Sequence, residues 1–108
     1  MSFQIFITSQ AHRDISKAAD YIAYTLNNQK AADDLLDETE AEIMSLASMP
    51  ERYALADDHV LASWGIRFLK IKNYLAFYTV DEEMQRVFII RFLYGKSNWT
   101  AILRHDLP

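Results

Sequence analysis

The sequence predicts an α+β domain of order β-α-α-β-β-β, in which a helical hairpin packs on an antiparallel sheet. Apolar residues recur at helical spacing through residues 10–49, and three apolar segments rich in β-forming residues follow within residues 66–94. Only two glycines and two prolines occur among the 108 residues, so there is little room for linkers and one domain is expected over residues 1–108. A chain of this length buries roughly 65% of its unfolded surface, and we expect it to fold without a cofactor.

The first strand is predicted at Phe3 to Ile7, and the first helix follows it from Gln10. Thr8 and Ser9 are suitable residues to cap that helix. Its apolar stripe consists of Ile15, Ala19, Ile22 and Leu26. Asn27-Asn28 should end this helix and cap the next one.

The second helix is predicted from Gln29 to Met49, because Pro50 cannot continue it. Its buried stripe consists of Ala32, Leu35, Leu36, Ile43 and Leu46. The carboxylates on its other faces are expected to be solvated, since a metal site would need ligands that converge from a loop. We therefore predict no metal and no cofactor. Residues 50–64 show neither the helical nor the strand period and are predicted to form a loop that has room for one helical turn.

Three strands are predicted at Ile66 to Ile71, Tyr74 to Val80 and Arg86 to Tyr94, and together they form an antiparallel meander. The last strand is apolar on both faces, which is typical of a central strand that is covered twice. Alternation places Val87, Ile89 and Leu93 on one face and Phe88, Ile90 and Phe92 on the other. The helical hairpin supplies one cover, and a bound partner segment is the expected second cover.

Charge is distributed unevenly along the chain. Residues 1–60 carry four cations and eleven carboxylates, a net of −7, whereas residues 61–108 carry seven cations and four carboxylates, a net of +3. The predicted sheet and its ends combine cations with aromatic rings: Arg67, Lys70, Lys72, Arg91 and Lys96, with Tyr74, Tyr78, Tyr94 and Trp99. This combination is typical of single-stranded nucleic acid binding, because phosphates attract charge and bases stack on rings.

Two alternatives apply to these cations. Lys70 and Lys72 can instead serve only to keep the end of a hairpin soluble. Arg91 stands between Ile90 and Phe92 on a buried strand, where an arginine is costly unless it meets a carboxylate, a carbonyl or a bound anion. Either a structural ion pair or a role in the site is therefore expected.

Several kinds of chemistry are not expected. The chain has no cysteine, which excludes disulfides and thiol catalysis, and none of its three histidines falls in the predicted sheet. The first residues lack a basic leader, and the apolar runs are too short to cross a bilayer. We therefore expect a cytoplasmic protein that has no membrane partner.

The most distinctive sequence motifs of the chain lie in three segments of the meander: Gly65-Ile66-Arg67, Asn73 to Tyr78, and Ile90 to Lys96. Together with Asp14-Ile15 and Ala18 to Ile22 on the first helix, they resemble the RelE/ParE superfamily of toxins from type II toxin–antitoxin modules. The resemblance implies a bacterial or archaeal protein that arrests growth. It also implies a cognate antitoxin whose flexible segment wraps the helices and sheet, and a higher-order toxin–antitoxin complex on operator DNA.

The superfamily divides by target. RelE-like members cut messenger RNA on the ribosome, and in such an enzyme Arg67, Arg91 and Tyr94 would be the catalytic residues. However, Leu75, Leu93 and Ser97 stand where that branch places an arginine, a histidine and a second arginine. ParE-like members instead bind DNA gyrase and block it.

The residues of the last two strands resemble those of ParE-like members more closely, which favours the gyrase interpretation. Its target-binding residues would be Arg67, Lys70, Lys72, Arg91, Tyr94, Lys96 and Trp99. A third interpretation is a non-toxic relative that retains only antitoxin binding.

Overall fold

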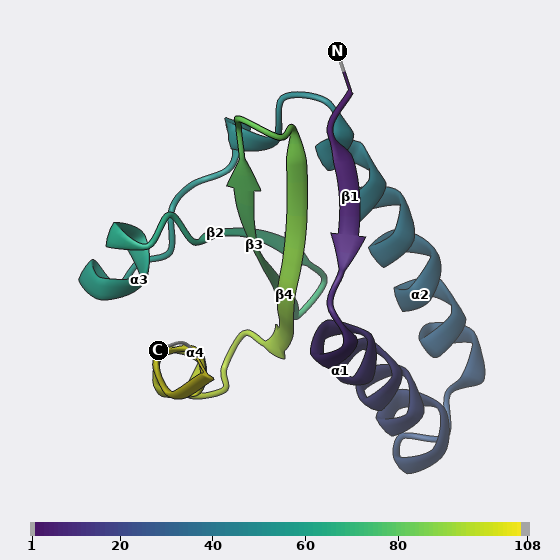
Figure 1. Ribbon diagram of the computed structural model, residues 1–108. Coiled ribbons are helices and arrows are strands. Elements are labelled where there is room, and N and C mark those ends of the chain that lie inside the picture. The colour runs from purple at the N-terminus through teal and green to yellow at the C-terminus, as the bar shows by residue number, and fades with distance from the viewer. Residues whose placement is uncertain (1, 107–108) are drawn as a thin grey trace.

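Four strands form a single mixed sheet in the computed structural model, which describes residues 2–106. The strands are β1 (Gln4–Ile7), β2 (Arg67–Ile71), β3 (Tyr74–Asp81) and β4 (Arg86–Tyr94). Their spatial order is β1-β4-β3-β2, so β4 is central (Figure 1). The last three strands form the predicted antiparallel meander, and the α+β class is confirmed. The sheet is mixed because β1 pairs with β4 in parallel, after the helical hairpin has carried the chain across the sheet.

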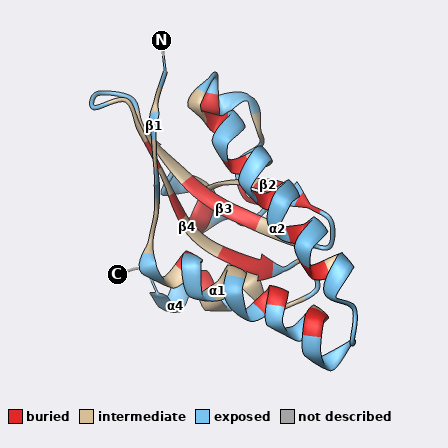
Figure 2. Cartoon of the chain, turned by 90° about the vertical axis from the view of Figure 1, so that its right-hand side faces the viewer, coloured by how far each residue is buried: buried red, intermediate tan, exposed pale blue. Residues whose placement is uncertain are grey.

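The helical hairpin covers one face of the sheet (Figure 2). Helix α1 (Ser9–Asp20) begins at Thr8, whose hydroxyl accepts the Ala11 N–H at 3.1 Å, and it ends in a π-helical turn, η1 (Tyr21–Thr25). Helix α2 (Gln29–Met44) begins at Asn28, whose side chain accepts the Ala31 N–H at 3.0 Å. Both caps were predicted from the sequence. The second helix is shorter than predicted, because the chain tightens into a 3₁₀ turn, η2 (Ser45–Ala47).

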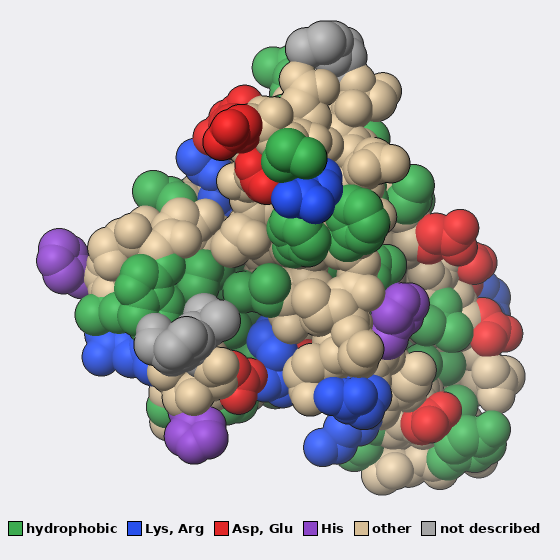
Figure 3. Space-filling model, viewed as in Figure 1, with side chains coloured by type: hydrophobic (Ala, Val, Ile, Leu, Met, Phe, Trp, Pro, Cys, Tyr) green, Lys and Arg blue, Asp and Glu red, His purple; other side chains and the backbone are tan. Residues whose placement is uncertain are grey.

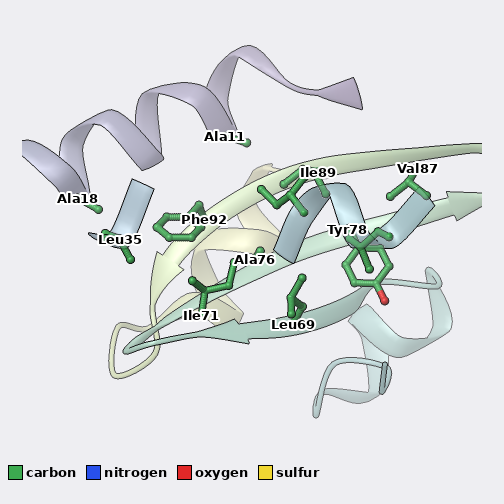
Figure 4. Packing of buried hydrophobic residues seen from close by; sticks show 12 residues of the cluster. Ala11, Ala18, Leu35, Leu69, Ile71, Ala76, Tyr78, Val87, Ile89 and Phe92 are labelled. Carbon is green, nitrogen blue, oxygen red and sulfur yellow. The ribbon is translucent and has the colours of Figure 1, made fainter. Parts of the chain in front are cut away.

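The main core lies between the hairpin and the sheet (Figure 4). Its buried members are Ala11, Ala18, Leu35, Ile43, Leu46, Leu69, Ile71, Ala76, Tyr78, Val87, Ile89 and Phe92. Two residues that were predicted to be buried are not: Leu26 is 57% exposed and Leu36 is 40% exposed. Leu26 follows the π-helical turn, whose wider ring shifts it off the apolar stripe.

One polar side chain in this layer is buried without a partner. Thr39 is 3% exposed, and its hydroxyl makes no hydrogen bond. Replacing it by valine removes an unsatisfied polar group while the shape changes little, so Thr39→Val should raise the free energy of unfolding by about 0.5–1 kcal/mol. Urea denaturation measures this change. Thr25→Val, at an exposed position of η1, is the control and should change it by less than about 0.5 kcal/mol. A loss of stability in Thr39→Val would contradict the prediction.

A β-bulge changes which residues of β4 share a face. Tyr78 pairs with Ile89 and Phe77 pairs with Arg91, so Ile90 is an extra residue on β4. As a result, Phe92 joins Val87 and Ile89 beneath the hairpin, while Leu93 lies with Ile90 on the opposite face. The strict alternation that the sequence analysis assumed is therefore wrong beyond Ile90, so that Phe92 and Leu93 exchange faces.

The second face of the sheet is partly covered by the chain itself. After the 3₁₀ turn η3 (Pro50–Arg52), helix α3 (His59–Ser63) and helix α4 (Trp99–Asp106) pack against it. Their cluster contains Ala56, Leu61, Ile66, Phe77, Leu93 and Leu103. The prediction that a partner must supply the second cover is therefore wrong for this half of the face, because α4 was not foreseen. Within residues 2–106, no helix has the length and apolar character needed to cross a membrane.

The other half of that face stays open. Phe6 and Phe88 are neighbours on β1 and β4, and their rings stack with centroids 5.4 Å apart. Phe6 is 41% exposed. Figure 3 shows hydrophobic side chains over this part of β1 and β4.

Candidate functional site

A groove of about 900 Å³ lies between the helical hairpin and the C-terminal end of β4. Most of its lining is apolar or aromatic: Ala18, Tyr21, Ile22, Leu26, Ala31, Leu35, Tyr74, Phe92, Leu93, Tyr94 and Ile102. Tyr21 and Leu26 on the hairpin side and Tyr94 on the sheet side are each more than 40% exposed. Apolar side chains therefore face solvent on both sides of the groove.

Stacked rings form part of the groove wall. Tyr74 lies parallel to Phe92, with centroids 5.1 Å apart and planes 10° apart, and its edge meets the ring of Tyr94 at 5.8 Å. Burial raises the pKa of the Tyr74 hydroxyl above its usual value, and the neighbouring Tyr94 and Tyr21 add to the shift. The Tyr74 hydroxyl is therefore neutral over the physiological range.

The Asp14 side chain accepts a backbone hydrogen bond at the edge of β4, beyond the point where β1 pairs with it. Strand β1 ends at Ile7, opposite Ile89, so the next part of β4 has no strand on that side. The Asp14 carboxylate accepts the Phe92 N–H at 3.0 Å and the Arg91 Nε–H at 2.7 Å, and its second oxygen accepts from Arg91 Nη2 at 3.1 Å. The Asp14 side chain is 8% exposed and that of Arg91 is 15% exposed. The pair is therefore a buried bidentate ion pair that joins α1 to β4.

Arg91 has a second carboxylate partner. Its Nη1 group donates to Asp106, in the last turn of α4, so one guanidinium connects α1, β4 and α4. Its hydrogen bond with Asp14 raises the pKa of Arg91, burial opposes this, and Asp106 raises it further. Of the two alternatives for Arg91, the structural ion pair is the one observed. The three groups together carry a net charge of −1, which does not favour a bound phosphate.

Two other predicted site cations also face carboxylates. Arg67 donates to the carbonyls of Glu51 and Tyr53, at 3.2 and 2.6 Å, and its Nη2 lies 3.7 Å from the Glu51 carboxylate. Lys72, in the turn before β3, lies 3.7 Å from Glu38 of α2. Arg67 thus ties the η3 segment to the sheet, and Lys72 ties the sheet to the hairpin.

The remaining predicted site residues are dispersed. Lys70 and Lys96 are exposed, and neither makes an ion pair within residues 2–106. Trp99 packs on Phe77, with centroids 5.3 Å apart, so its ring belongs to the cluster beneath α4. Of the seven predicted target-binding residues, only Lys72, Arg91 and Tyr94 line the groove. Their target-binding role stays a prediction.

Two groove residues with functional potential, Asp14 and Lys17, were not singled out from the sequence as site residues, and neither was Asp106, which pairs with Arg91. Asp14 falls three residues after Ala11 and four before Ala18, both of which are buried, and this helical spacing was the available signal. Nothing in the sequence links Asp106 to Arg91, because α4 was not predicted. Among the described residues, no three His, Asp or Glu side chains are arranged to hold a metal ion.

Comparison with known proteins gives one family and several structures. The family is described as the ParE toxin of the type II toxin-antitoxin system parDE, and its match covers residues 5–99. No curated protein sequence matches.

Three solved structures share the fold. A chain of a chromosomal ParDE toxin–antitoxin system from P. aeruginosa has 16% identity and a TM-score of 0.71, over 88% of this chain and 98% of that one. The E. coli RelE toxin, as a double arginine-to-alanine mutant in the free state, has 14% identity and a TM-score of 0.66, over 99% and 100%. A chain of the RelBE2 complex from Mycobacterium tuberculosis has 19% identity and a TM-score of 0.59, over 87% and 99%.

Proposed function

This chain belongs to the ParE toxin family of type II toxin–antitoxin systems, and from that premise we propose that it arrests growth by binding and inhibiting DNA gyrase. A cognate antitoxin is the partner that this family implies. The alternative to gyrase inhibition is the ribosome-dependent cleavage of messenger RNA. Assembly of the toxin–antitoxin pair on operator DNA belongs to the same proposal.

The observation that carries the proposal is the internal neutralisation of the sheet cations. Arg67, Lys72 and Arg91 each face at least one carboxylate of the same chain. Affinity for RNA depends largely on cations that are free to neutralise phosphates, and among the five predicted cations of the sheet and its ends only Lys70 and Lys96 have no carboxylate partner within residues 2–106. A groove with apolar walls suits a protein segment better than a nucleic acid strand.

The residues of a ribonuclease are also poorly assembled. Of the three that would be catalytic, Arg91 and Tyr94 line the groove, whereas Arg67 is engaged with residues 51–53 outside it. Cleavage of RNA needs a base for the 2′-hydroxyl and donors for the charge that develops on phosphorus, within hydrogen-bond reach of one another. Inhibition by binding requires no such constellation, which supports the gyrase interpretation.

The decisive experiment is to induce the protein without antitoxin and follow the incorporation of labelled thymidine and labelled leucine over the first minutes. We expect thymidine incorporation to fall first, because inhibited gyrase stops DNA synthesis before translation fails. Co-expression of the antitoxin is the control and should restore both. An earlier loss of leucine would instead support a ribonuclease that uses Arg67, Arg91 and Tyr94. If neither falls, the chain is an antitoxin-binding relative without toxicity.

A further inference from the structure

The two outer strands of the sheet, β1 and β2, differ in how their free edges are covered. At β2, the segment 54–56 lies along the edge. The Phe68 N–H donates to the Ala54 carbonyl at 3.1 Å, and the Ala56 N–H donates to the Ile66 carbonyl at 2.8 Å. The chain therefore covers this edge itself, which prevents it from pairing with a strand of another molecule.

The outer edge of β1 is open. The N–H groups of Gln4 and Thr8 donate to backbone carbonyls on the β4 side, at 2.9 and 3.0 Å, so alternate residues of β1 use their backbone groups toward β4. The backbone groups of Ile5 and Ile7 therefore point to the other side, where they make no hydrogen bond within residues 2–106. Figure 2 views the molecule from this side, and no described helix lies in front of β1.

The sequence around this edge lacks the features that usually prevent strand pairing. Residues 2–10 include no charged residue, proline or glycine. Strand β1 pairs with β4 in an unbroken register, so no bulge turns the edge away. The start of the edge is covered, because the Phe3 N–H donates to the Ala47 carbonyl at 2.8 Å. The backbone groups of Ile5 and Ile7, two donors and two acceptors, remain available to another strand.

We propose that β1 pairs antiparallel with β1 of a second copy of this chain, about a two-fold axis at Phe6. Ile5 lies opposite Ile7 of the second copy and Ile7 lies opposite Ile5, so the free groups of both chains form four N–H···O bonds. Phe6 lies opposite Phe6 of the second copy, at a position without backbone bonds, where the two Cα atoms are only about 4.5 Å apart. The two four-stranded sheets thereby join into one.

The side chains of β1 are complementary to themselves in this register, which selects a second copy as the occupant. Phe6 is 41% exposed and stacks on Phe88 with centroids 5.4 Å apart, so pairing extends the stack to both copies and covers Phe6. Gln4 lies opposite Thr8 of the second copy, and Ile5 lies opposite Ile7, so no like charges oppose each other in any pair. Because the paired strands are short, the interface is small and the dimer dissociates readily.

Single cysteines test both the pairing and its register, because the chain has no cysteine of its own. Phe6→Cys places the thiols of the two copies opposite each other, at a distance that a disulfide spans. Gln4→Cys is the matched control, since residue 4 is on the same strand and face, but its two copies are about 13 Å apart in this register. In a glutathione redox buffer, the covalent dimer of Phe6→Cys should form at least about tenfold faster than that of Gln4→Cys. Equal rates would overturn the proposed register.

The unsubstituted chain provides an independent measurement. By sedimentation equilibrium, its mean mass should rise with concentration from that of one chain toward that of two. Over the same range, hydrogen exchange of the Ile5 and Ile7 amides should slow roughly tenfold, whereas the Gln4 and Thr8 amides, which are bonded toward β4, should change by less than about twofold.

Two results of these measurements would overturn the proposal. A mass that stays at one chain at every concentration would leave the edge to a strand of a different protein. A dimer in which the Ile5 and Ile7 amides exchange at the rate of the monomer would mean that another surface joins the copies.

A charge at the two-fold axis tests the contact between the rings. Phe6→Lys places two ammonium groups side by side and should weaken the association at least about tenfold. Tyr24→Lys, at an aromatic residue of η1 that is 77% exposed, is the control and should leave the association within about twofold of the parent chain. Circular dichroism shows whether each variant is folded, and an unchanged association of folded Phe6→Lys would overturn the proposal. None of these experiments involves growth arrest, gyrase or RNA, so their outcome is independent of the proposed function.

Discussion

Replacing Asp14 by asparagine is expected to lower the free energy of unfolding by about 2–4 kcal/mol, the largest effect of any single substitution considered for this chain. The amide retains one acceptor oxygen for four donors, which are the Arg91 Nε, the Arg91 Nη2, the Phe92 N–H and the Gln10 Nε2. It also leaves the charge of a largely buried guanidinium with only one carboxylate partner. For a domain of this size the melting temperature should fall by roughly 10 to 25 °C, which thermal denaturation followed by circular dichroism measures.

Asp106→Asn is the matched control, because it removes the other carboxylate from the same guanidinium. The Asp106 side chain is 36% exposed, so water can replace it, and we expect a loss below about 1 kcal/mol. Equal losses in the free energy of unfolding for the two substitutions would mean that the hydrogen bond from the Phe92 N–H to Asp14 adds nothing to stability. That outcome would contradict the prediction for Asp14.

Local signals in the sequence predicted the α+β class, the helical hairpin and the three-stranded meander, but not the parallel pairing of β1 with β4. Thr8 and Asn28 cap the helices as expected, and the hairpin and the meander follow from the periods of their apolar residues. The β-bulge at Ile90 could not be predicted in this way, because a single extra residue leaves the composition of β4 unchanged. Helix α4 was missed because its burial depends on Trp99 and Leu103 packing against a distant strand and a loop.

The candidate site was less predictable than the fold, and ion pairing is the physical reason. The sequence places Arg91 on a buried strand but does not identify its partner, which is 77 residues away on α1. The same holds for Arg67 with Glu51 and for Lys72 with Glu38. The basic character of residues 61–108 is thus largely compensated by carboxylates of residues 1–60, which a count of charges within each half cannot reveal.

This compensation changes which residues are free to bind a partner. Lys70 and Lys96 keep free ammonium groups on the sheet and beyond its end, and Lys17 keeps one on α1, as far as residues 2–106 are concerned. Arg91, one of the seven predicted target-binding residues, contributes mainly to the shape of the groove by fixing α1 and α4 to β4. A loss of toxicity in an Arg91 variant can therefore result from unfolding. The stability of the variant must be measured before the loss is assigned to target binding.

The second large effect is a loss of stability in alkaline solution, which we expect to arise from Tyr78. This residue is fully buried, and its hydroxyl donates to the Pro50 carbonyl at 2.6 Å. Burial raises the pKa of Tyr78 to about 12, although Arg67 and Arg52 partly oppose the shift. In the unfolded chain the same hydroxyl has a pKa of about 10. Below pH 10 both states are protonated, so the contribution of Tyr78 to stability is fully present there.

Between pH 10 and 12 the unfolded chain loses the Tyr78 proton while the folded chain keeps it, so unfolding becomes easier as the pH rises. The free energy of unfolding should fall by about 2–3 kcal/mol across this window. Tyr78→Phe isolates the effect, because every other titrating group, including Tyr74, is common to both proteins. Phenylalanine leaves the Pro50 carbonyl unpaired and should be about 1 kcal/mol less stable at pH 8, yet the variant should equal or exceed the parent at pH 12. Urea denaturation at intervals of one pH unit gives the difference in the free energy of unfolding between the two proteins. A difference that stays constant from pH 8 to pH 12 would show that the fold does not hold the Tyr78 hydroxyl in its protonated form.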